Sequence, residues 1–212
     1  MSQNRQKPGP GRPKDPAKRA AILQAAQVLF LRSGYEGTSM DAIASEAGVS
    51  KLTVYSHFTD KETLYAAAIR AVCEAQLPDL YQDELPPQDL HLTLERIGNA
   101  FCELLDSPES LALHRLLVSM AGQDAKLAPL FYEVGPQRVC DGMVRLLNQA
   151  CARGELAIPH PEEAARQFFT LLKGDNHFKL LIGCGVVMSK LERRQHVSTV
   201  VTLFLRLYAL VE

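Results

Sequence analysis

Residues 38–58 read TSMDAIASEAGVSKLTVYSHF, a segment that predicts two short helices joined by a tight turn. Thr38 with an acid three residues later has the spacing of a capping box, which predicts a short helix over about residues 40–47. A glycine-containing turn over residues 48–50 follows, and its final serine is a typical N-cap for a second helix over about residues 51–57. Two short helices joined by such a turn form the pattern of a helix-turn-helix, although many helical hairpins share it.

The second of these helices has one face that can pack in a core and one face that can contact DNA. Val54 and Phe58 lie four residues apart and can face a core. The other side chains supply a positive charge, hydroxyl groups and an imidazole, and the second helix of a helix-turn-helix can lie in the major groove of DNA. The residues predicted to reach phosphates or bases from this helix and its cap are Ser50, Lys51, Leu52, Thr53, Tyr55, Ser56 and His57.

Helices are also predicted on both sides of this pair. Before it, an apolar stripe at helical spacing over about residues 16–33 is followed by Gly34, a typical helix stop. After it, Thr59 and Glu62 repeat the capping-box spacing and open a fourth helix that runs toward Gln76. The stripe of the first helix consists of Ile22, Ala26, Leu29 and Phe30.

The remainder of the chain continues as helices. Two prolines at 86 and 87 separate the four-helix unit from the rest, and the sequence shows neither period-two alternation nor an internal repeat. The chain is therefore predicted to be all-α, with an N-terminal three-helix helix-turn-helix domain and a helical C-terminal domain. Further helices are expected to begin at Asp89, at Ser107-Pro108, at Gly135-Pro136 and at Pro161, and the last one to span about residues 191–210.

Charge is distributed unevenly along the 212 residues. The first 70 residues carry ten Lys and Arg against six Asp and Glu, a net charge of +4, whereas the remainder carries thirteen against eighteen, a net charge of −5. This asymmetry favours contact of the first part alone with a polyanion such as DNA, although differences of this size also arise by chance. Contents of 47% hydrophobic and 22% charged residues are typical of a globular protein.

Cysteine and histidine usage argues against several classes of site. The five cysteines form no CxxC pair, so free thiols in a reducing cytoplasm are expected, with a redox-sensing thiol as the alternative. With the six histidines they form no metal-ligand pattern, and neither a metal nor a cofactor is expected. Cys184 lies between two glycines without an identifiable base, so catalysis is not expected. The sequence predicts neither a signal peptide nor a membrane span, which agrees with a cytoplasmic location.

About residues 18–65 match a known pattern position by position. The matching segments include ILQAA at 22–26, GYEGTSM at 34–40, AGVS at 47–50 and TVY at 53–55, in order and without a gap. This stretch closely resembles the DNA-binding region of the TetR/AcrR family of bacterial transcriptional regulators. The resemblance implies a DNA-binding domain over residues 17–65, a homodimer, a near-palindromic double-stranded operator and a small apolar or amphipathic ligand.

The resemblance also assigns roles to individual residues. Thr38 and Ser39 would contact phosphate at a helix N-terminus, where exposed N–H groups favour an anion. Residues 51–53 would approach bases. The residues that would clamp phosphates are Tyr55, His57 and Lys61. The alternatives are a core position for the tyrosine and a solvated charge for the lysine.

Residues 1–16 form a predicted flexible basic arm. The segment PGPGRPK at 8–14 resembles the Gly-Arg-Pro core of AT-hook proteins, which place arginine in the minor groove. The alternative is a disordered tail that attracts phosphates nonspecifically. Arg12 and Lys14 would strengthen DNA binding in either case.

Residues 66–212 form the predicted ligand-binding and dimerisation domain. FYEVGP at 131–136 and GEL at 154–156 resemble the AefR-like C-terminal subgroup, some of whose relatives control drug-efflux pumps. The resemblance implies a ligand-responsive repressor of a transport or multidrug-efflux operon. A regulator of a catabolic or metabolic operon, or an activator, is the alternative.

Two groups of side chains in this domain receive roles from the family resemblance. The last two helices would pair with their twins in a dimer, unless their apolar residues belong to the core of a single chain. The interface is predicted at the level of whole helices, and the residues that represent it are Phe168, Leu172, Val200, Val201, Phe204 and Tyr208. The last helix is also apolar away from this stripe, at Leu203, Leu207 and Leu210. The predicted ligand-binding residues, many of which could be ordinary core, are Phe101, Leu105, His114, Leu117, Met120, Phe131, Met143, Leu147 and His177.

Overall fold

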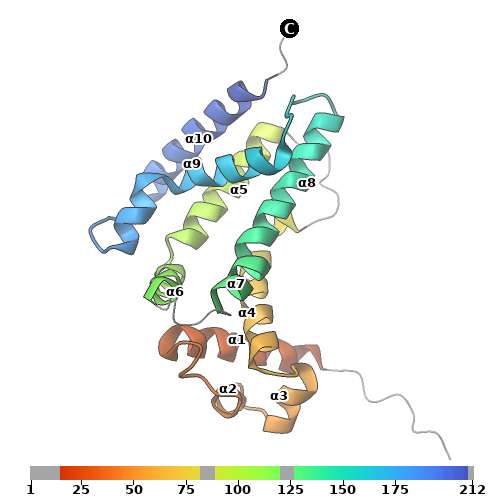
Figure 1. Cartoon of the computed structure of the whole chain (residues 1–212), viewed down its shortest axis with the longest axis vertical. Helices are drawn as coiled ribbons and strands as arrows, with labels where there is room; N and C mark the ends of the chain where they lie inside the picture. The colour runs from red at the N-terminus through yellow and green to blue at the C-terminus, as the bar shows by residue number, and fades with distance from the viewer. Residues whose placement is uncertain (1–14, 82–88, 120–126, 210–212) are drawn as a thin grey trace, which may run out of the picture. The chain divides into compact units, whose positions relative to one another are not determined.

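The computed structural model describes residues 15–81, 89–119 and 127–209, and all regular secondary structure in these ranges is helical (Figure 1). The all-α prediction is therefore confirmed for them. The residues up to Tyr65 and those from Ala66 onward form two compact units. Most of the predicted basic arm, the last three residues and three predicted site residues lie outside the described ranges. These site residues are Arg12, Lys14 and Met120.

The first unit contains three helices and the beginning of a fourth. They are α1 (Pro16–Ser33), α2 (Met40–Glu46), α3 (Lys51–His57) and α4 (Lys61–Gln76). The predicted stripe of α1 is buried, which confirms the periodicity from which the helix was inferred. The rings of Phe30, Tyr35 and Tyr65 pack together, with centroids between 5.1 and 5.8 Å apart. This aromatic cluster joins the first and fourth helices to the loop that follows α1.

Two helix N-caps differ from the prediction by one residue. The N-cap of α2 is Ser39, whose side chain accepts a hydrogen bond from the N–H three residues later, and not Thr38. At α4 the carboxylate of Asp60 accepts the corresponding bond at 2.7 Å, so the cap is not Thr59. An aspartate is a strong cap because its negative charge also interacts favourably with the helix dipole. The capping-box spacing therefore locates each helix correctly but places its N-cap one residue early.

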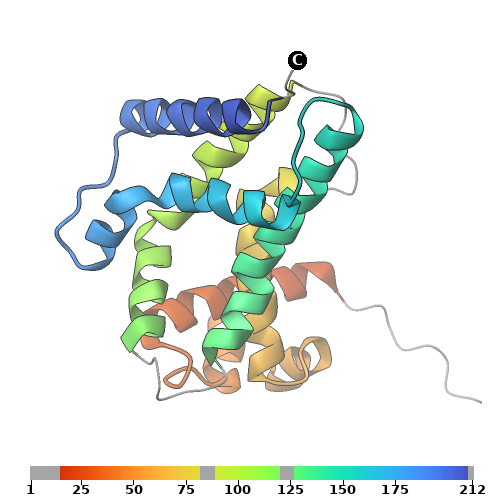
Figure 2. The same cartoon turned by 45° about the horizontal axis from the view of Figure 1, so that its top comes forward.

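The second unit contains the rest of α4 and the remaining helices (Figures 1 and 2). Within it α5 packs along α10, and α8 packs against α9. The predicted starts at Asp89, Ser107 and Pro161 are confirmed. The elements are η1 (Pro78–Leu80), α5 (Leu90–Leu105), α6 (Pro108–Ser119), α7 (Leu127–Tyr132), η2 (Glu133–Gln137), α8 (Arg138–Ala152), α9 (Pro161–Leu181) and α10 (Lys190–Leu207).

The prediction that a new helix begins at Gly135-Pro136 is wrong. α7 continues into α8 through a single π-helical stretch, η2, which contains Pro136. A proline lacks the N–H of a regular helical turn, and a wide π turn accommodates this loss without ending the helix. Gly135 permits close packing at the same place, since a β-carbon there would lie 3.3 Å from a methyl carbon of Ile69.

Helix α9 is interrupted at Gly174, a feature that the sequence analysis did not predict. This residue has φ 53° and ψ −165°, a conformation that favours glycine. Near the break, the carbonyl of Leu172 lies 3.0 Å from Nε2 of His196 on α10. This contact joins α10 to α9 two residues before the interruption.

The core of the second unit corrects the predicted dimer interface. Five of its six residues are buried within a single chain, so these side chains pack in the core of that chain, whereas the assignment of the last two helices to the interface stays a prediction. Tyr208 is half-buried and its hydroxyl donates to Gln167 at 2.7 Å. The five buried residues are Phe168, Leu172, Val200, Val201 and Phe204. The alternative reading of that stripe, burial in the core of one chain, is correct.

A second apolar face of α9 and α10 remains exposed. Leu203 and Leu207 are 53% and 66% exposed, and Leu171 on α9 is also exposed. α10 ends at Leu207, three residues before the predicted end, and is opened by a complete capping box between Ser189 and Glu192. The helix is thus apolar on two sides, one packed in the core of its own chain and one uncovered.

Candidate DNA interface and effector region

The turn between α2 and α3 aims the second helix of the motif. Gly48 has φ +64°, a conformation that favours glycine, and it lets the chain reverse within three residues. Ser50 then caps α3 by accepting a bond from the N–H of Thr53 at 3.1 Å, as predicted. Val54 and Phe58 are buried beneath the helix, which confirms the predicted inner face.

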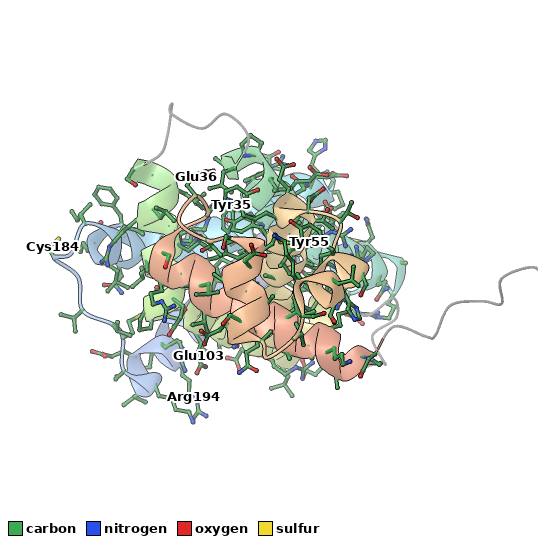
Figure 3. The ribbon with its side chains drawn as sticks, turned by 90° about the horizontal axis from the view of Figure 1, so that it is seen from below. Tyr35, Glu36, Tyr55, Glu103, Cys184 and Arg194 are labelled. Atoms are coloured by element: carbon green, nitrogen blue, oxygen red, sulfur yellow. The ribbon has the colours of Figure 1, made fainter. Side chains whose placement is uncertain are left out.

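The opposite face of α3 is open to solvent and chemically mixed. Lys51, Leu52, Tyr55 and Ser56 are exposed, and their spacing places them on one side of the helix. Leu52 is 81% exposed, although an isolated surface leucine would gain from burial. Tyr55 projects from α3 (Figure 3), so it is not a core residue. A charge, a methyl-bearing side chain and hydroxyl groups therefore share one surface.

Several hydroxyl groups of α3 have partners within the helix. Oγ of Ser56 donates to the carbonyl of Thr53 at 2.7 Å, and the hydroxyls of Ser50 and Thr53 lie 2.8 Å apart. His57 at the end of the helix is half-buried. These contacts preorganise the side chains and leave the exposed lysine and tyrosine as the groups with the greatest reach.

Lys51 is paired with an acid from the other helix of the motif. Its Nζ lies 2.8 and 2.9 Å from the two carboxylate oxygens of Asp41 on α2. Both side chains are exposed, and the hydrogen bond to Asp41 is the main reason that the pKa of Lys51 is raised. The sequence analysis missed this pair, although an acid in the first turn of α2 could have suggested it. The ion pair links the start of α2 to the start of α3.

Thr38 and Lys61 have contacts within the first unit that were not predicted. Thr38 is only 3% exposed, and its hydroxyl lies 2.7 and 3.1 Å from the carbonyls of Gly34 and Leu29. Its predicted phosphate contact is therefore wrong, because the hydroxyl is buried. The ammonium of Lys61 donates to the carbonyl of Tyr35 at 2.8 Å and lies 4.1 Å from the centre of its ring. Ser39 remains exposed at the start of α2.

Replacing Thr38 by Val is expected to lower the free energy of unfolding by about 1–2 kcal/mol, because the hydroxyl is lost while the shape is retained. Urea denaturation followed by circular dichroism measures this change. Thr38→Ser, which keeps the hydroxyl, is the matched control and should lose less stability. Unchanged stability together with weaker DNA binding would instead support the predicted contact of Thr38 with phosphate.

The predicted ligand-binding residues divide into two groups. Phe101, Leu105, Met143 and Leu147 are buried in the main core of the second unit, and Leu117 is half-buried on α6. His114, Phe131 and His177 come together from three helices. The ring of His114 lies 5.7 Å from that of Phe131 and 5.6 Å from that of His177, edge to face in both cases.

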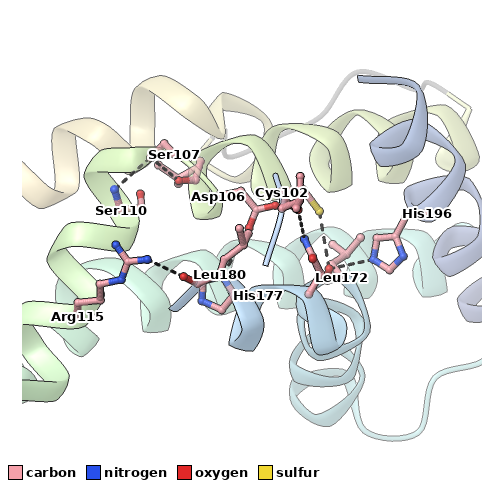
Figure 4. Close-up of polar contacts among 12 residues, drawn as sticks. Cys102, Asp106, Ser107, Ser110, Arg115, Leu172, His177, Leu180 and His196 are labelled. Carbon is pink, nitrogen blue, oxygen red and sulfur yellow. Dashed lines mark hydrogen bonds and ion pairs between the residues drawn. The ribbon is translucent and has the colours of Figure 1, made fainter. Parts of the chain in front are cut away.

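Two further polar residues surround this cluster and were not predicted. Asp106, at the end of α5, is buried, and its Oδ1 lies 3.6 Å from Nδ1 of His177 (Figure 4). Arg115 donates from α6 to the carbonyls of Leu180 and Leu181, at 2.6 and 2.9 Å, where α9 ends. An aspartate after a helix and an arginine within one are common on surfaces, so the sequence offered no signal for either contact.

The cysteines differ in their access to solvent. Cys184 is exposed in the loop between α9 and α10 (Figure 3), whereas Cys73 and Cys102 are buried. Burial raises the pKa of Cys73 to about 11 and that of Cys102 to about 12. Since the thiolate is the reactive form, the buried pair is protected both by protonation and by packing.

Alkylation by iodoacetamide at pH 8 is therefore expected to modify Cys184 in the native protein at least tenfold faster than Cys73 or Cys102. Both buried thiols would still be protonated, because pH 8 lies well below their raised pKa values. Peptide mass spectrometry at timed intervals measures the three rates, and the same reaction in 8 M urea is the control. Rapid native labelling of Cys102 would contradict the packing described above.

The described residues also bear on two other classes of site. No group of three or more His, Cys, Asp or Glu side chains in these ranges could hold a metal ion. Among the same residues, no helix is both long enough and apolar enough to cross a membrane.

Comparison with known proteins agrees with this geometry. Residues 22–68 match bacterial regulatory proteins of the tetR family, and residues 92–210 match the C-terminal domain of AefR-like transcriptional repressors. The HTH-type transcriptional regulator RutR of Escherichia coli K12 is 38% identical over 73 residues, and this match spans 34% of either chain. The match thus covers only about a third of that relative's length.

Two other relatives match over much more of their length. The HTH-type transcriptional repressor BepR of Brucella suis is 29% identical over 167 residues, which cover 74% of this chain and 77% of BepR. The structure of the flavonoid-responsive regulator FrrA is 32% identical with a TM-score of 0.68, and the match covers 91% of this chain and 97% of FrrA. Together with the two domain matches, these show that the chain belongs to the TetR family of DNA-binding transcriptional regulators and carries an AefR-like C-terminal domain.

Proposed function

We propose that this protein is a ligand-responsive repressor that acts as a homodimer on the operator of a transport or multidrug-efflux operon. The observation that carries the proposal is the AefR-like repressor match over residues 92–210, which spans most of the second unit. BepR matches over most of its length and is named a repressor, which supports repression over activation. The role in efflux rests on the resemblance to the AefR-like subgroup.

Each part of the chain has a role in this proposal. Residues 17–65 bind DNA and residues 66–212 bind the ligand and dimerise, in agreement with the division into compact units after Tyr65. The basic arm over residues 1–16 adds affinity through Arg12 and Lys14. Apart from the arm, the proposed DNA contacts are Ser39, Ser50, Lys51, Leu52, Thr53, Tyr55, Ser56, His57 and Lys61.

The DNA contacts follow from the exposed face of α3. A lysine and a tyrosine hydroxyl suit phosphates, and the leucine suits the methyl group of a thymine in the major groove. On binding, Lys51 exchanges its bond with Asp41 for one with DNA or shares it between the two. Two copies of this face are needed to meet two half-sites, so dimerisation is part of the DNA-binding mechanism.

The dimer is proposed to form through the uncovered apolar face of α9 and α10. Leu171, Leu203 and Leu207 are exposed on these two helices, whereas the other side of each is packed in the core of its own chain. Burial of leucine side chains against a second copy removes apolar surface from water and stabilises association.

A second candidate function is control of a catabolic operon for aromatic compounds. It is favoured by one observation, the likeness over nearly the whole chain to a regulator described as responsive to flavonoids. Transcript profiling of a deletion strain distinguishes the two candidates. Raised transcripts for a transporter support efflux control, raised transcripts for degradative enzymes support the second candidate, and lowered transcripts support an activator.

Titration of the purified protein against the DNA upstream of its own gene, at 50 and 200 mM salt, tests the proposal directly. Binding that resists competitor DNA and weakens at least tenfold at the higher salt is expected, because phosphate contacts release counterions. Binding no tighter than to random DNA would contradict an operator at this place. Selection from genomic fragments would then show whether a specific site exists elsewhere.

A further inference from the structure

The cluster of Asp106, His114, Phe131 and His177 lies where four helices of the second unit meet. Asp106 follows α5, His114 belongs to α6, Phe131 to α7 and His177 to the part of α9 beyond the break at Gly174. The two imidazoles are perpendicular to each other, with an interplanar angle of 88°. Phe131 is packed against the first of them at 83°, so the ring of His114 contacts both other rings edge to face.

Both imidazoles present a buried nitrogen that is unsatisfied. Nδ1 of His114 and Nδ1 of His177 have no hydrogen-bond partner among the described residues. The carboxylate of Asp106 approaches the second of these nitrogens but stays at 3.6 Å, beyond hydrogen-bonding distance. A buried polar atom without a partner costs about 1–3 kcal/mol, and such atoms are uncommon in native proteins.

The charge state of His114 restricts the kind of chemical group that could bind its unpaired Nδ1. Burial, the neighbouring His177 and Lys173 lower the pKa of His114 to about 4. At neutral pH this ring is therefore uncharged and carries one N–H donor and one lone pair. A neutral ring binds a hydroxyl group well, because a hydroxyl can both donate and accept, whereas a carboxylate prefers a positively charged partner.

We propose that His114 and His177 form the polar anchor of the effector site, and that the effector is a planar aromatic molecule bearing an uncharged hydroxyl group. The inference rests on the proposed ligand response and gives the ligand a chemical class. The rings of Phe131 and the two histidines receive the aromatic part, and the free Nδ1 atoms receive the hydroxyl.

The anchor would couple binding to the packing of two helices. His114 lies on α6 directly before Arg115, which holds the end of α9 through the carbonyls of Leu180 and Leu181. His177 lies on that same end of α9. A hydroxyl shared by the two imidazoles therefore bridges the helices that the arginine already joins (Figure 4), so a ligand that binds there favours one arrangement of α6 and α9.

Calorimetric titration of the purified full-length protein with 2-naphthol, 2-methylnaphthalene and 2-naphthoate tests the proposal. The naphthol is expected to bind at least tenfold more tightly than the other two. His114→Phe and His177→Phe retain a ring at each position but remove the nitrogens, so each variant should lose this preference. His160→Phe, at an exposed position before α9, is the matched control and should keep it.

Four other outcomes would contradict the proposal that the two histidines anchor the ligand. Equal binding of the three compounds, no binding of any, tighter binding of the naphthoate, or a preference that survives in both variants would each do so. Circular dichroism verifies folding, and a variant that fails this check leaves the other histidine variant to decide. Gel shifts with operator DNA distinguish this proposal from the proposed function. Specific DNA binding without a preference for the hydroxyl compound would contradict the histidine anchor and leave the role as a DNA-binding regulator intact.

Discussion

Replacing both Leu203 and Leu207 by Glu is expected to convert the protein into a folded monomer with at least a thousandfold weaker self-association. The two side chains are 53% and 66% exposed in the single chain, so the substitutions should not disturb its core. In a dimer each glutamate would be buried without a positive partner, and breaking an interface in this way costs several kcal/mol. About 4 kcal/mol corresponds to the thousandfold change.

Sedimentation velocity over a range of concentrations measures this change, and operator affinity should fall with it because one half-site alone is then held. Leu92→Glu together with Val118→Glu is the matched control. These residues are exposed on α5 and α6, and the same added charge should leave the dimer intact. If the Leu203 and Leu207 variant remains a dimer, the interface does not lie on this face of α10.

Replacing both Lys51 and Tyr55 by Ala is expected to weaken operator binding by about a hundredfold while leaving the fold intact. Both side chains are exposed on α3, and neither contributes to the core. Loss of the lysine also leaves the carboxylate of Asp41 without its ion-pair partner. Each lost phosphate contact should reduce the slope of log affinity against log salt by about 1.

Fluorescence anisotropy with labelled operator at several salt concentrations measures affinity and slope together. Tyr132→Ala with Arg138→Ala is the control, since it removes the same types of side chain from exposed positions in the second unit. Unaltered operator affinity in the Lys51 and Tyr55 variant would show that another surface reads the DNA.

The helix-turn-helix could be predicted from sequence because its signals are local. Helix periodicity, the glycine turn and the serine cap of α3 each depend on a few neighbouring residues, and the structure confirms them. The caps of α2 and α4 were misplaced by one residue, since adjacent polar residues compete for the same N–H groups. The π turn at Pro136 was misread because proline usually marks a helix start.

The site was harder to predict because it depends on tertiary contacts. Burial of Thr38, the ion pair of Lys51 with Asp41, and the approach of Asp106 to His177 join residues whose proximity leaves no local pattern. The interface error has the same origin. A helix that is apolar on two sides does not reveal which side packs inside its own chain, and the stripe around Phe204 was the inner one.

The π turn between α7 and α8 bears on how such a chain can change in length during evolution. Each residue of an α-helix advances it by about 100°, so inserting one residue normally rotates everything that follows. A π turn absorbs one additional residue within a single wide turn. Deleting Pro136 would remove both the additional residue and the missing N–H, and would leave a regular helix in which Phe131 and Met143 keep their orientations. Here a lineage could lose a codon without turning Phe131 or Met143 away from the interior.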